Sequence, residues 1–351
     1  MTTRVARIGV LTAAALLLAA CSSGATMPPS TTGAASSSTV APSESPTPVV
    51  SATPGAGLAA DASPFSGRPH GAGKPVLVVK FDDTTFAQPH AGLAAADIVY
   101  VEEVEYGLTR LAAVFSTELP RIVGPVRSAR ISDIDLLAQF GKPAFAYSGS
   151  QHKLRPLLAK ASLYDVSGDM GPTGYFRDGA RRAPYNFMGE PKALLARAPH
   201  ASAAQDIGFA FSVPVPAGGR PVAQAVVPYP DSQARFVWNR RTHVFDVYLN
   251  KRPAREAGGG TQHATTVVVQ YVRQSDSGFH DKYGGRTPLL RTVGSGKAWV
   301  LRDGRAWLCT WSRPVASSGT TFTTADGQQM LFAPGQVWVA LANSKAKVVV
   351  R

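Results

Sequence analysis

The chain has 351 residues, of which 36 are Lys or Arg and 23 are Asp or Glu, so its formal net charge at pH 7 is +13. A chain this basic indicates an anionic partner or an anionic surface. It contains only 2 Cys and its 7 His are scattered singly, so the sequence excludes a zinc site of the usual Cys/His spacing and indicates no metal and no cofactor.

Residues 1–20 are predicted to be the signal peptide of a bacterial lipoprotein. Arg4 and Arg7 form a basic start, and residues 8–18 form an apolar run that is too short to span a bilayer. The run ends in Leu-Ala-Ala-Cys, the pattern in which Cys21 is lipidated and becomes the new N-terminus. We therefore expect an extracytoplasmic protein, held at the outer face of the cytoplasmic membrane by palmitate or a related lipid on Cys21.

Residues 21–63 are almost wholly Ser, Thr, Ala, Pro, Gly and Val. Such a segment buries too little apolar surface to offset the entropy of ordering, so it is predicted to be a disordered tether with a reach on the order of 35 Å. Its two acidic residues balance the two basic residues of the signal peptide, so the folded part carries the whole net charge of +13. An exported body of this charge meets anionic lipid and cell-wall polymers, which excludes nucleic acid as its partner.

The pattern of apolar residues and turns in the remaining chain predicts an α+β protein with two domains. Residues 64–212 read as a mixed α/β domain, with strands at 76–81, 97–105, 109–116 and 144–147 and helices at 128–141, 153–161 and 191–208. Residues 213–351 read as an antiparallel β domain, a meander or small barrel, with strands at 235–238, 243–249, 265–272, 297–301, 306–311, 322–324, 330–332 and 337–341. Four tryptophans at strand spacing are predicted to be core residues, and Cys309 between two of them a buried, inert thiol: Trp299, Trp307, Trp311 and Trp338.

Charged residues gather at the strand ends of the first half. Asp82 follows the apolar strand 76–81, and Glu105 ends an acidic run in the next strand. Arg110 follows a tight turn, and Arg127 and Arg130 flank Ser128, which is predicted to cap the helix 128–141. One interpretation is a set of ion pairs that fixes loops against the sheet. The other is an anion-binding pocket at a helix start, where free N–H groups favour phosphate or carboxylate.

Three strings resemble the YerB-like lipoprotein family. They are Glu-Tyr-Gly-Leu-Thr-Arg at 105–110, Gly-Pro-Val-Arg-Ser-Ala-Arg at 124–130 and Arg-Ala-Pro-Tyr-Asn at 182–186, and similar strings continue to residue 342. The family has paired N- and C-terminal domains of unknown function, so the resemblance implies an exported lipoprotein and no particular chemistry. Its matching polar positions fall on Asp97, Glu105, Arg110, Arg127, Ser128, Arg130 and Asn186. Tyr185 stands where relatives have His, so the resemblance does not support a catalytic His.

Our hypothesis is an envelope protein that binds an anionic cell-wall polymer, peptidoglycan, a lipid head group or an envelope protein, and that is not evidently an enzyme. The residues predicted to bind the ligand are Arg110, Arg127, Ser128, Arg130, Arg182 and Asn186. One alternative is a peptidoglycan- or glycan-acting hydrolase or transferase that uses Asp82 and Glu105 as acid and base. A second alternative is a structural scaffold with no ligand. The oligomeric state is not specified by these patterns.

Overall fold

The computed structural model describes residues 52–281 and 283–351, which belong to one compact unit. The predicted signal peptide, the lipidation at Cys21 and the tether as far as residue 51 lie outside the described residues. None of the helices within the described ranges is long and apolar enough to cross a bilayer.

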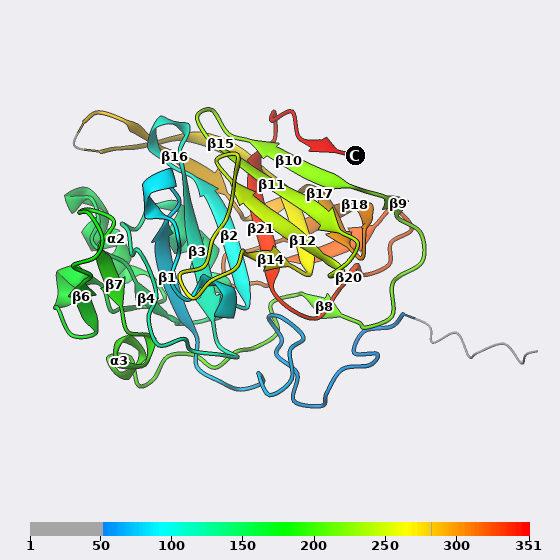
Figure 1. Cartoon of the computed structure of the whole chain (residues 1–351), viewed down its shortest axis with the longest axis horizontal. Helices are drawn as coiled ribbons and strands as arrows, with labels where there is room; N and C mark the ends of the chain where they lie inside the picture. The colour runs from blue at the N-terminus through cyan, green and yellow to red at the C-terminus, as the bar shows by residue number, and fades with distance from the viewer. Residues whose placement is uncertain (1–51, 282) are drawn as a thin grey trace, which may run out of the picture. The chain divides into compact units, whose positions relative to one another are not determined.

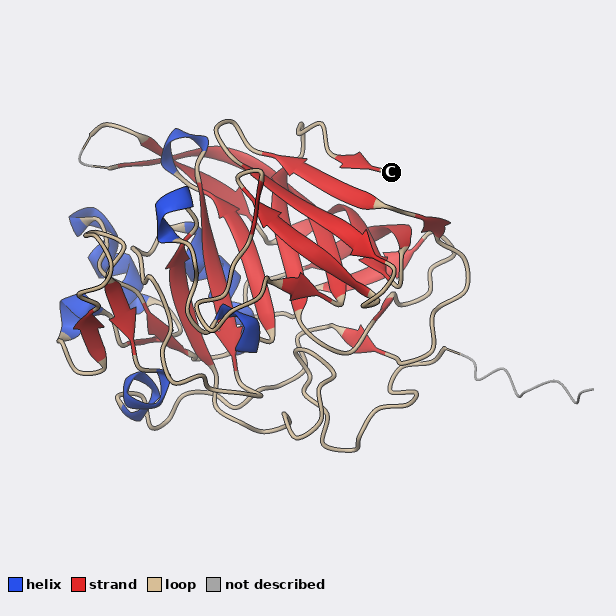
Figure 2. Cartoon of the chain, in the orientation of Figure 1, coloured by secondary structure: helices blue, strands red, loops and turns tan. Residues whose placement is uncertain are grey.

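A 12-stranded mixed sheet forms the centre of this unit (Figures 1 and 2). Its main path runs in the order β19 (Thr321–Thr324), β18 (Arg305–Arg313), β17 (Gly294–Arg302), β15 (Thr266–His280), β21 (Val337–Asn343), β2 (Ile98–Glu103), β3 (Thr109–Phe115), β1 (Leu77–Asp82), β4 (Ala144–Ala146) and β5 (Tyr164–Asp165). Two further strands complete it: β16 (Arg286–Arg291) pairs with β15, and β9 (Arg220–Pro221) pairs with β18. Strands therefore predominate, with few helices.

Strand β21 lies between the two sequence halves. It runs parallel to β15 on one side and parallel to β2 on the other, with Val337 opposite both Thr266 and Ile98. The expectation of a purely antiparallel C-terminal half is therefore wrong at this strand, which pairs in parallel with both of its neighbours. The two sequence halves share one continuous sheet, and the domain boundary at residues 212 and 213 stays a prediction.

A six-stranded antiparallel sheet covers part of one face of the large sheet. Its strands follow the meander expected for the C-terminal half, whereas most of the remaining C-terminal strands lie in the large mixed sheet. It consists of β13 (Arg252–Pro253), β12 (Val244–Leu249), β11 (Gln233–Asn239), β10 (Gln224–Pro228) and β22 (Val349–Val350), with β14 (His263–Ala264) paired to β12. Alternate residues of β12 are buried, as period-2 patterning requires. Phe236 of this sheet packs edge-on against Trp338 of β21, with ring centroids 6.0 Å apart, so a single core joins the two sheets.

The helices are short and lie around the N-terminal strands. They are α1 (Ser132–Leu137), α2 (Arg155–Lys160) and α3 (Pro191–Ala196), with 3-10 turns at Thr85–Ala87, Leu93–Ala95, Glu105–Gly107, Ala138–Phe140, His152–Leu154 and Gly168–Met170. Two small sheets complete the fold: β6 (Tyr175–Arg177) with β7 (Phe187–Gly189), and β8 (Ala210–Phe211) with β20 (Leu331–Phe332). The helix predicted at 191–208 is thus only six residues long.

Residues 52–63 pack against the folded unit, although the sequence places them in the tether. The Gly55 N–H donates to the Phe211 carbonyl at 2.8 Å, and the Val213 N–H donates to the Ala56 carbonyl at 2.9 Å. Leu58 packs against buried core residues. These contacts pair backbone groups in a segment that its composition predicts to be disordered. The folded part therefore begins earlier than residue 64.

The C-terminal tryptophans divide into two groups. Trp307, Trp311 and Trp338 are buried, as predicted, whereas Trp299 is only half-buried. Cys309 is a buried free thiol, and burial raises its pKa to about 12, so it is unreactive at neutral pH.

Candidate functional site

The site begins where β1 ends. This strand is Leu-Val-Val-Lys-Phe-Asp, and all six residues are buried because β3 and β4 pair with its two edges and a core cluster packs on each face. Its antiparallel pairing with β3 places Asp82 directly opposite Arg110. A buried, mostly apolar strand therefore ends in a carboxylate that lies opposite an arginine of the neighbouring strand.

The segment that carries Arg127 is extended, and the helix predicted to start at Ser128 begins only at Ser132. Backbone pairing is the reason: the Asp82 N–H donates to the Pro125 carbonyl, and the Arg127 N–H donates to the Lys80 carbonyl at 2.8 Å. These bonds hold the segment along the edge of β1, which helical dihedrals would not permit. Arg127 and Arg130 therefore lie outside any helix start.

Asp82 joins the two arginines. Arg127 Nε lies 2.7 Å from Asp82 Oδ2, in an orientation unfavourable for a hydrogen bond, and Arg110 Nη1 lies 3.9 Å from Asp82 Oδ1. Burial alone would raise the pKa of Asp82, but Arg110 and Arg127 outweigh it and hold that pKa below its ordinary value. Two guanidinium groups thus share one ionised carboxylate.

Arg110 is the more confined of the two. It is 6% exposed, its Nη1 donates to the Thr109 carbonyl, and its Nε has no hydrogen-bond partner. Burial, together with the nearby charges of Arg127 and Arg130, lowers the pKa of Arg110 against the attraction of Asp82. The centre therefore carries an excess of positive charge.

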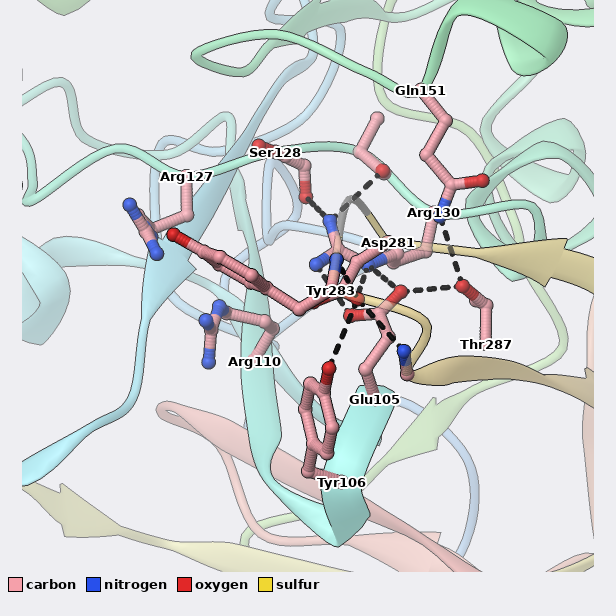
Figure 3. A network of polar contacts seen from close by, with 12 residues as sticks. Glu105, Tyr106, Arg110, Arg127, Ser128, Arg130, Gln151, Asp281, Tyr283 and Thr287 are labelled. Carbon is pink, nitrogen blue, oxygen red and sulfur yellow. Dashed lines mark hydrogen bonds and ion pairs between the residues drawn. The ribbon is translucent and has the colours of Figure 1, made fainter.

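Arg130 and Glu105 form a second pair, shown in Figure 3. Glu105 sits in the β2–β3 turn, which Tyr106 and Gly107 close with positive φ angles of 61° and 69°. Arg130 Nε donates to Glu105 Oε1 at 2.7 Å and Nη2 donates to Oε2 at 2.6 Å, while Thr287 donates to the same carboxylate. Arg130 Nη1 donates to two backbone carbonyls, so every nitrogen of this guanidinium group is already engaged.

A pocket of about 360 Å³ opens beside Arg127. We call it the arginine pocket, and its lining is Val126, Arg127, Ser148, Gly168, Arg177, Pro184 and Phe187. Arg177 is held by Asn186, whose Oδ1 accepts from Nη1 at 2.8 Å, and its guanidinium lies 5.2 Å from the Phe187 ring. The Nη groups of Arg127 donate to none of the described residues, so two positioned arginines present free donors to one pocket.

A larger pocket of about 740 Å³ shares Pro184 with the arginine pocket. Arg182 lines it and is exposed, beside the Phe86 and Tyr185 rings, whose centroids are 5.8 Å apart. The structure therefore separates the predicted ligand residues. Arg182 lines the larger pocket, whereas Asn186 holds an arginine of the smaller one.

Ser128 lines neither pocket, but its hydroxyl lies 3.4 Å from the hydroxyl of Ser148, which lines the arginine pocket. Figure 3 shows Arg110 and Arg127 on one side of the view, away from the Glu105–Arg130 pair. The Tyr283 ring reaches toward them from the tip of the β15–β16 hairpin (Figure 3).

Asp82 and Glu105 do not form an acid and base pair. Each is bound to its own arginine, and although burial acts to raise the pKa of Glu105, Arg130 and Thr287 lower it. A general acid at neutral pH needs a raised pKa. Both carboxylates are ionised, so the geometry gives the glycan-hydrolase interpretation no acid.

A fully buried triad lies next to this centre. Lys80 Nζ donates to Glu102 at 2.7 Å and to Asp133 at 2.5 Å, and all three side chains are at most 1% exposed. Burial acts to lower the pKa of Lys80, but the two carboxylates raise it, so the ammonium stays charged. This triad is a structural cluster of one cation and two carboxylates. It resembles the ion pairs that, in one interpretation of the sequence, fix loops against the sheet.

Sequence reasoning placed Arg110, Arg127 and Asp82 at one site but missed several of their neighbours. Arg177, in the same loop as Arg182, was a candidate cation for the buried carboxylates but not a predicted ligand residue, and nothing in the sequence indicated that Ser148 lines a pocket. Thr287 lies 182 positions from Glu105, and nothing local indicates that contact. Within the described residues, no three His, Cys, Asp or Glu side chains are placed to hold a metal ion.

Known proteins match most of the chain. Residues 65–204 match the family model described as the N-terminal domain of a protein of unknown function, DUF3048, and residues 225–339 match the model of its C-terminal domain. A Bacillus subtilis (strain 168) protein named "Putative lipoprotein YerB" is 25% identical over 286 residues, which cover 76% of this chain and 80% of that protein.

A solved structure shares the fold. The crystal structure of the YerB protein from Bacillus subtilis aligns with a TM-score of 0.68 and 17% sequence identity. The alignment covers 82% of this chain and 99% of that one. At this identity the likeness concerns the fold alone.

Proposed function

Since this chain belongs to the DUF3048 family, as its resemblance to YerB-like lipoproteins predicted, we propose that it is a lipid-anchored envelope protein that binds an anionic group in the arginine pocket. The proposed location at the membrane rests on the Leu-Ala-Ala-Cys pattern ending at Cys21 and on a relative named as a putative lipoprotein. The ligand is a phosphate or carboxylate group of a cell-wall polymer, of peptidoglycan or of a lipid head group.

One observation carries the proposal: Arg127 and Arg177 face the same pocket while each is fixed from behind. Asp82 holds Arg127 and Asn186 holds Arg177, so their orientation is set before any ligand arrives. Planar guanidinium groups bind phosphate and carboxylate in a bidentate manner, and pre-set donors lose little side-chain entropy on binding. Arg110 behind them adds positive charge.

The test measures binding of inorganic phosphate, glycerol 3-phosphate and acetate to residues 52–351 by calorimetry, and of isolated cell walls by co-sedimentation. We expect Arg177→Gln to weaken binding about tenfold or more, because a charge-assisted hydrogen bond contributes about 1.5–3 kcal/mol. Arg177 is exposed, so this variant keeps its fold. Binding should also weaken as salt is added.

Arg155→Gln is the matched control. Arg155 is an exposed arginine that pairs with Asp169 at 3.0 Å, and it does not line the arginine pocket. Unchanged affinity in Arg177→Gln, or no binding of any probe by the folded wild-type chain, would overturn the proposal and favour a scaffold without a ligand. Release of new muropeptides from the cell walls would favour a hydrolase instead.

A further inference from the structure

A second charged surface lies far along the chain from the arginine pocket, on strands of the C-terminal half. Its exposed cations are Arg273 on β15, Arg291 on β16, Lys297 on β17 and Arg220 on β9. Trp299 and Leu308 accompany them on β17 and β18, where the two residues are direct cross-strand neighbours. We call these six residues the basic face.

The basic face has no matching acidic residues. No carboxylate lies within 4.0 Å of its four cations among the described residues, unlike Arg110, Arg127 and Arg130. Arg220 lies over the Trp299 ring at 4.9 Å from the centroid and donates to the Val350 carbonyl, so it is held without losing its charge. Asp326 is the one carboxylate in the lining of the two hollows that the face borders, of about 740 and 600 Å³.

Apolar side chains project from the same face. Leu308 is 48% exposed and Trp299 is half-buried, although strands of a soluble sheet place polar residues at such outward positions. Cations interleaved with an indole ring and an aliphatic side chain are the composition of surfaces that lie in the head-group region of a bilayer. A purely electrostatic contact with a soluble polymer would not need the apolar pair.

The chain's N-terminal side joins the folded unit at this face. Ala52, Thr53 and Pro54 line the same hollow as Arg220, Trp299 and Leu308. Figure 1 shows the start of the described chain on the same side of the view as β9 and β18. Residue 52 is only 31 positions from Cys21 in the sequence, and the tether predicted from the composition of this segment would reach about 30 Å over that length.

We propose that the basic face docks on the head groups of anionic phospholipids. Basic residues close to a membrane surface are attracted to anionic lipid, and the attraction falls off within a Debye length. Lipid on Cys21 would hold the basic face within reach of the bilayer, and the face would then orient the folded unit on it. This inference rests on the lipid anchor of the proposed function but not on the arginine pocket.

The experiment uses residues 52–351, which carry no lipid, and vesicles of phosphatidylglycerol with phosphatidylcholine or of phosphatidylcholine alone. We expect co-sedimentation with the anionic vesicles at 0.15 M salt and none with the neutral ones. The triple variant Arg273→Gln, Arg291→Gln and Lys297→Gln should bind roughly a hundredfold more weakly, since each basic residue near an anionic surface contributes about fivefold. Leu308→Ser should weaken the binding that survives at high salt.

The control removes the same charge from the other side of the unit, through Lys153→Gln, Lys160→Gln and Lys192→Gln, which are exposed residues at α2 and α3. Equal losses in the two triple variants would overturn the proposal, because net charge alone would then explain the binding. So would binding to isolated anionic wall polymer but not to vesicles. The triple variant of the basic face should bind inorganic phosphate with wild-type affinity, because none of its three residues lines the arginine pocket, and this separates the two surfaces.

Discussion

Asp83 is a buried carboxyl group without a cationic partner in contact. It is 1% exposed, accepts a hydrogen bond from Thr109 through Oδ2, and has no partner for Oδ1. Burial raises its pKa to about 7, and the neighbouring charge of Asp82 acts in the same direction. The residue that follows the site's central carboxylate is therefore protonated over much of the acidic range.

This protonation predicts a pH dependence of stability. Between about pH 4 and pH 7 the folded state binds more protons than the unfolded state, so the free energy of unfolding falls as pH rises and levels off above pH 7. In Asp83→Asn this contribution is absent. Relative to the variant, the wild type should lose about 2–3 kcal/mol between pH 5 and pH 8, as measured by urea unfolding.

Asp231→Asn provides the comparison, because Asp231 is exposed. It should follow the wild-type pH profile. If Asp83→Asn also runs parallel to the wild type from pH 5 to pH 8, then Asp83 is ionised in the folded protein throughout this range.

At the scale of elements, the β15–β16 hairpin of the C-terminal half is fastened onto the N-terminal half. Ser132 accepts a hydrogen bond from the buried Leu290 N–H at 2.9 Å and donates to the Pro288 carbonyl at 3.4 Å. Gln151 donates to Thr287 at 3.1 Å, and Thr287 donates to Glu105. The hairpin thereby supports the Glu105–Arg130 pair from a distant part of the chain.

Ser132→Ala should loosen this hairpin. The substitution leaves the Leu290 N–H buried without a partner, which costs about 1–3 kcal/mol in the free energy of unfolding. Limited proteolysis should show faster cleavage near residues 278–285, and urea unfolding should show the loss of stability. Ser162→Ala removes an exposed hydrogen bond to the Gly141 carbonyl and should change neither by much. Unchanged proteolysis in Ser132→Ala would mean that other contacts fasten the hairpin.

Local sequence patterns predicted the secondary-structure elements well but did not predict the contacts between those elements. The strands at 76–81, 97–105 and 109–116 correspond to β1, β2 and β3, because alternating or continuous apolar runs read directly as strands. The helix predicted at 128–141 is present as α1 and the 3-10 turn after it, but its predicted start at Ser128 was wrong. A favourable capping residue carries no information about the pairing of residues 125–127 with β1. The contact of Thr287 with Glu105 could not be predicted from local sequence either, since the position of Thr287 depends on a hairpin that folds back across the molecule.

On the scale of the whole molecule, β21 connects the two halves of the large sheet. Its residues are almost all buried, and it contributes pairing on both sides. Without it, β2 and β15 would each have an unpaired edge in the middle of the core. The fold therefore depends on β21, a strand that is far from β2 in sequence.

Deleting residues 337–351 should therefore abolish cooperative unfolding of the whole unit. Circular dichroism during thermal unfolding should show a broad, shallow transition, because Trp338 and its neighbours leave the core open. Deleting only residues 347–351 removes the edge strand β22 and should leave a cooperative transition at lower temperature. A sharp transition in the longer deletion would show instead that residues 64–212 fold as an independent domain.

The position of β21 also orders events in time. If residues 1–20 are the signal peptide that the sequence predicts, and the chain crosses the membrane N-terminus first, β2 emerges long before residues 337–343 do. Until then the growing chain exposes strand edges that attract other chains, so slow folding carries a risk of aggregation. On that route the central sheet would close only when translocation is nearly finished, so a chain stalled or cleaved partway would present open edges to envelope proteases. The same insertion that unites the two halves thus makes full export the condition for a finished fold.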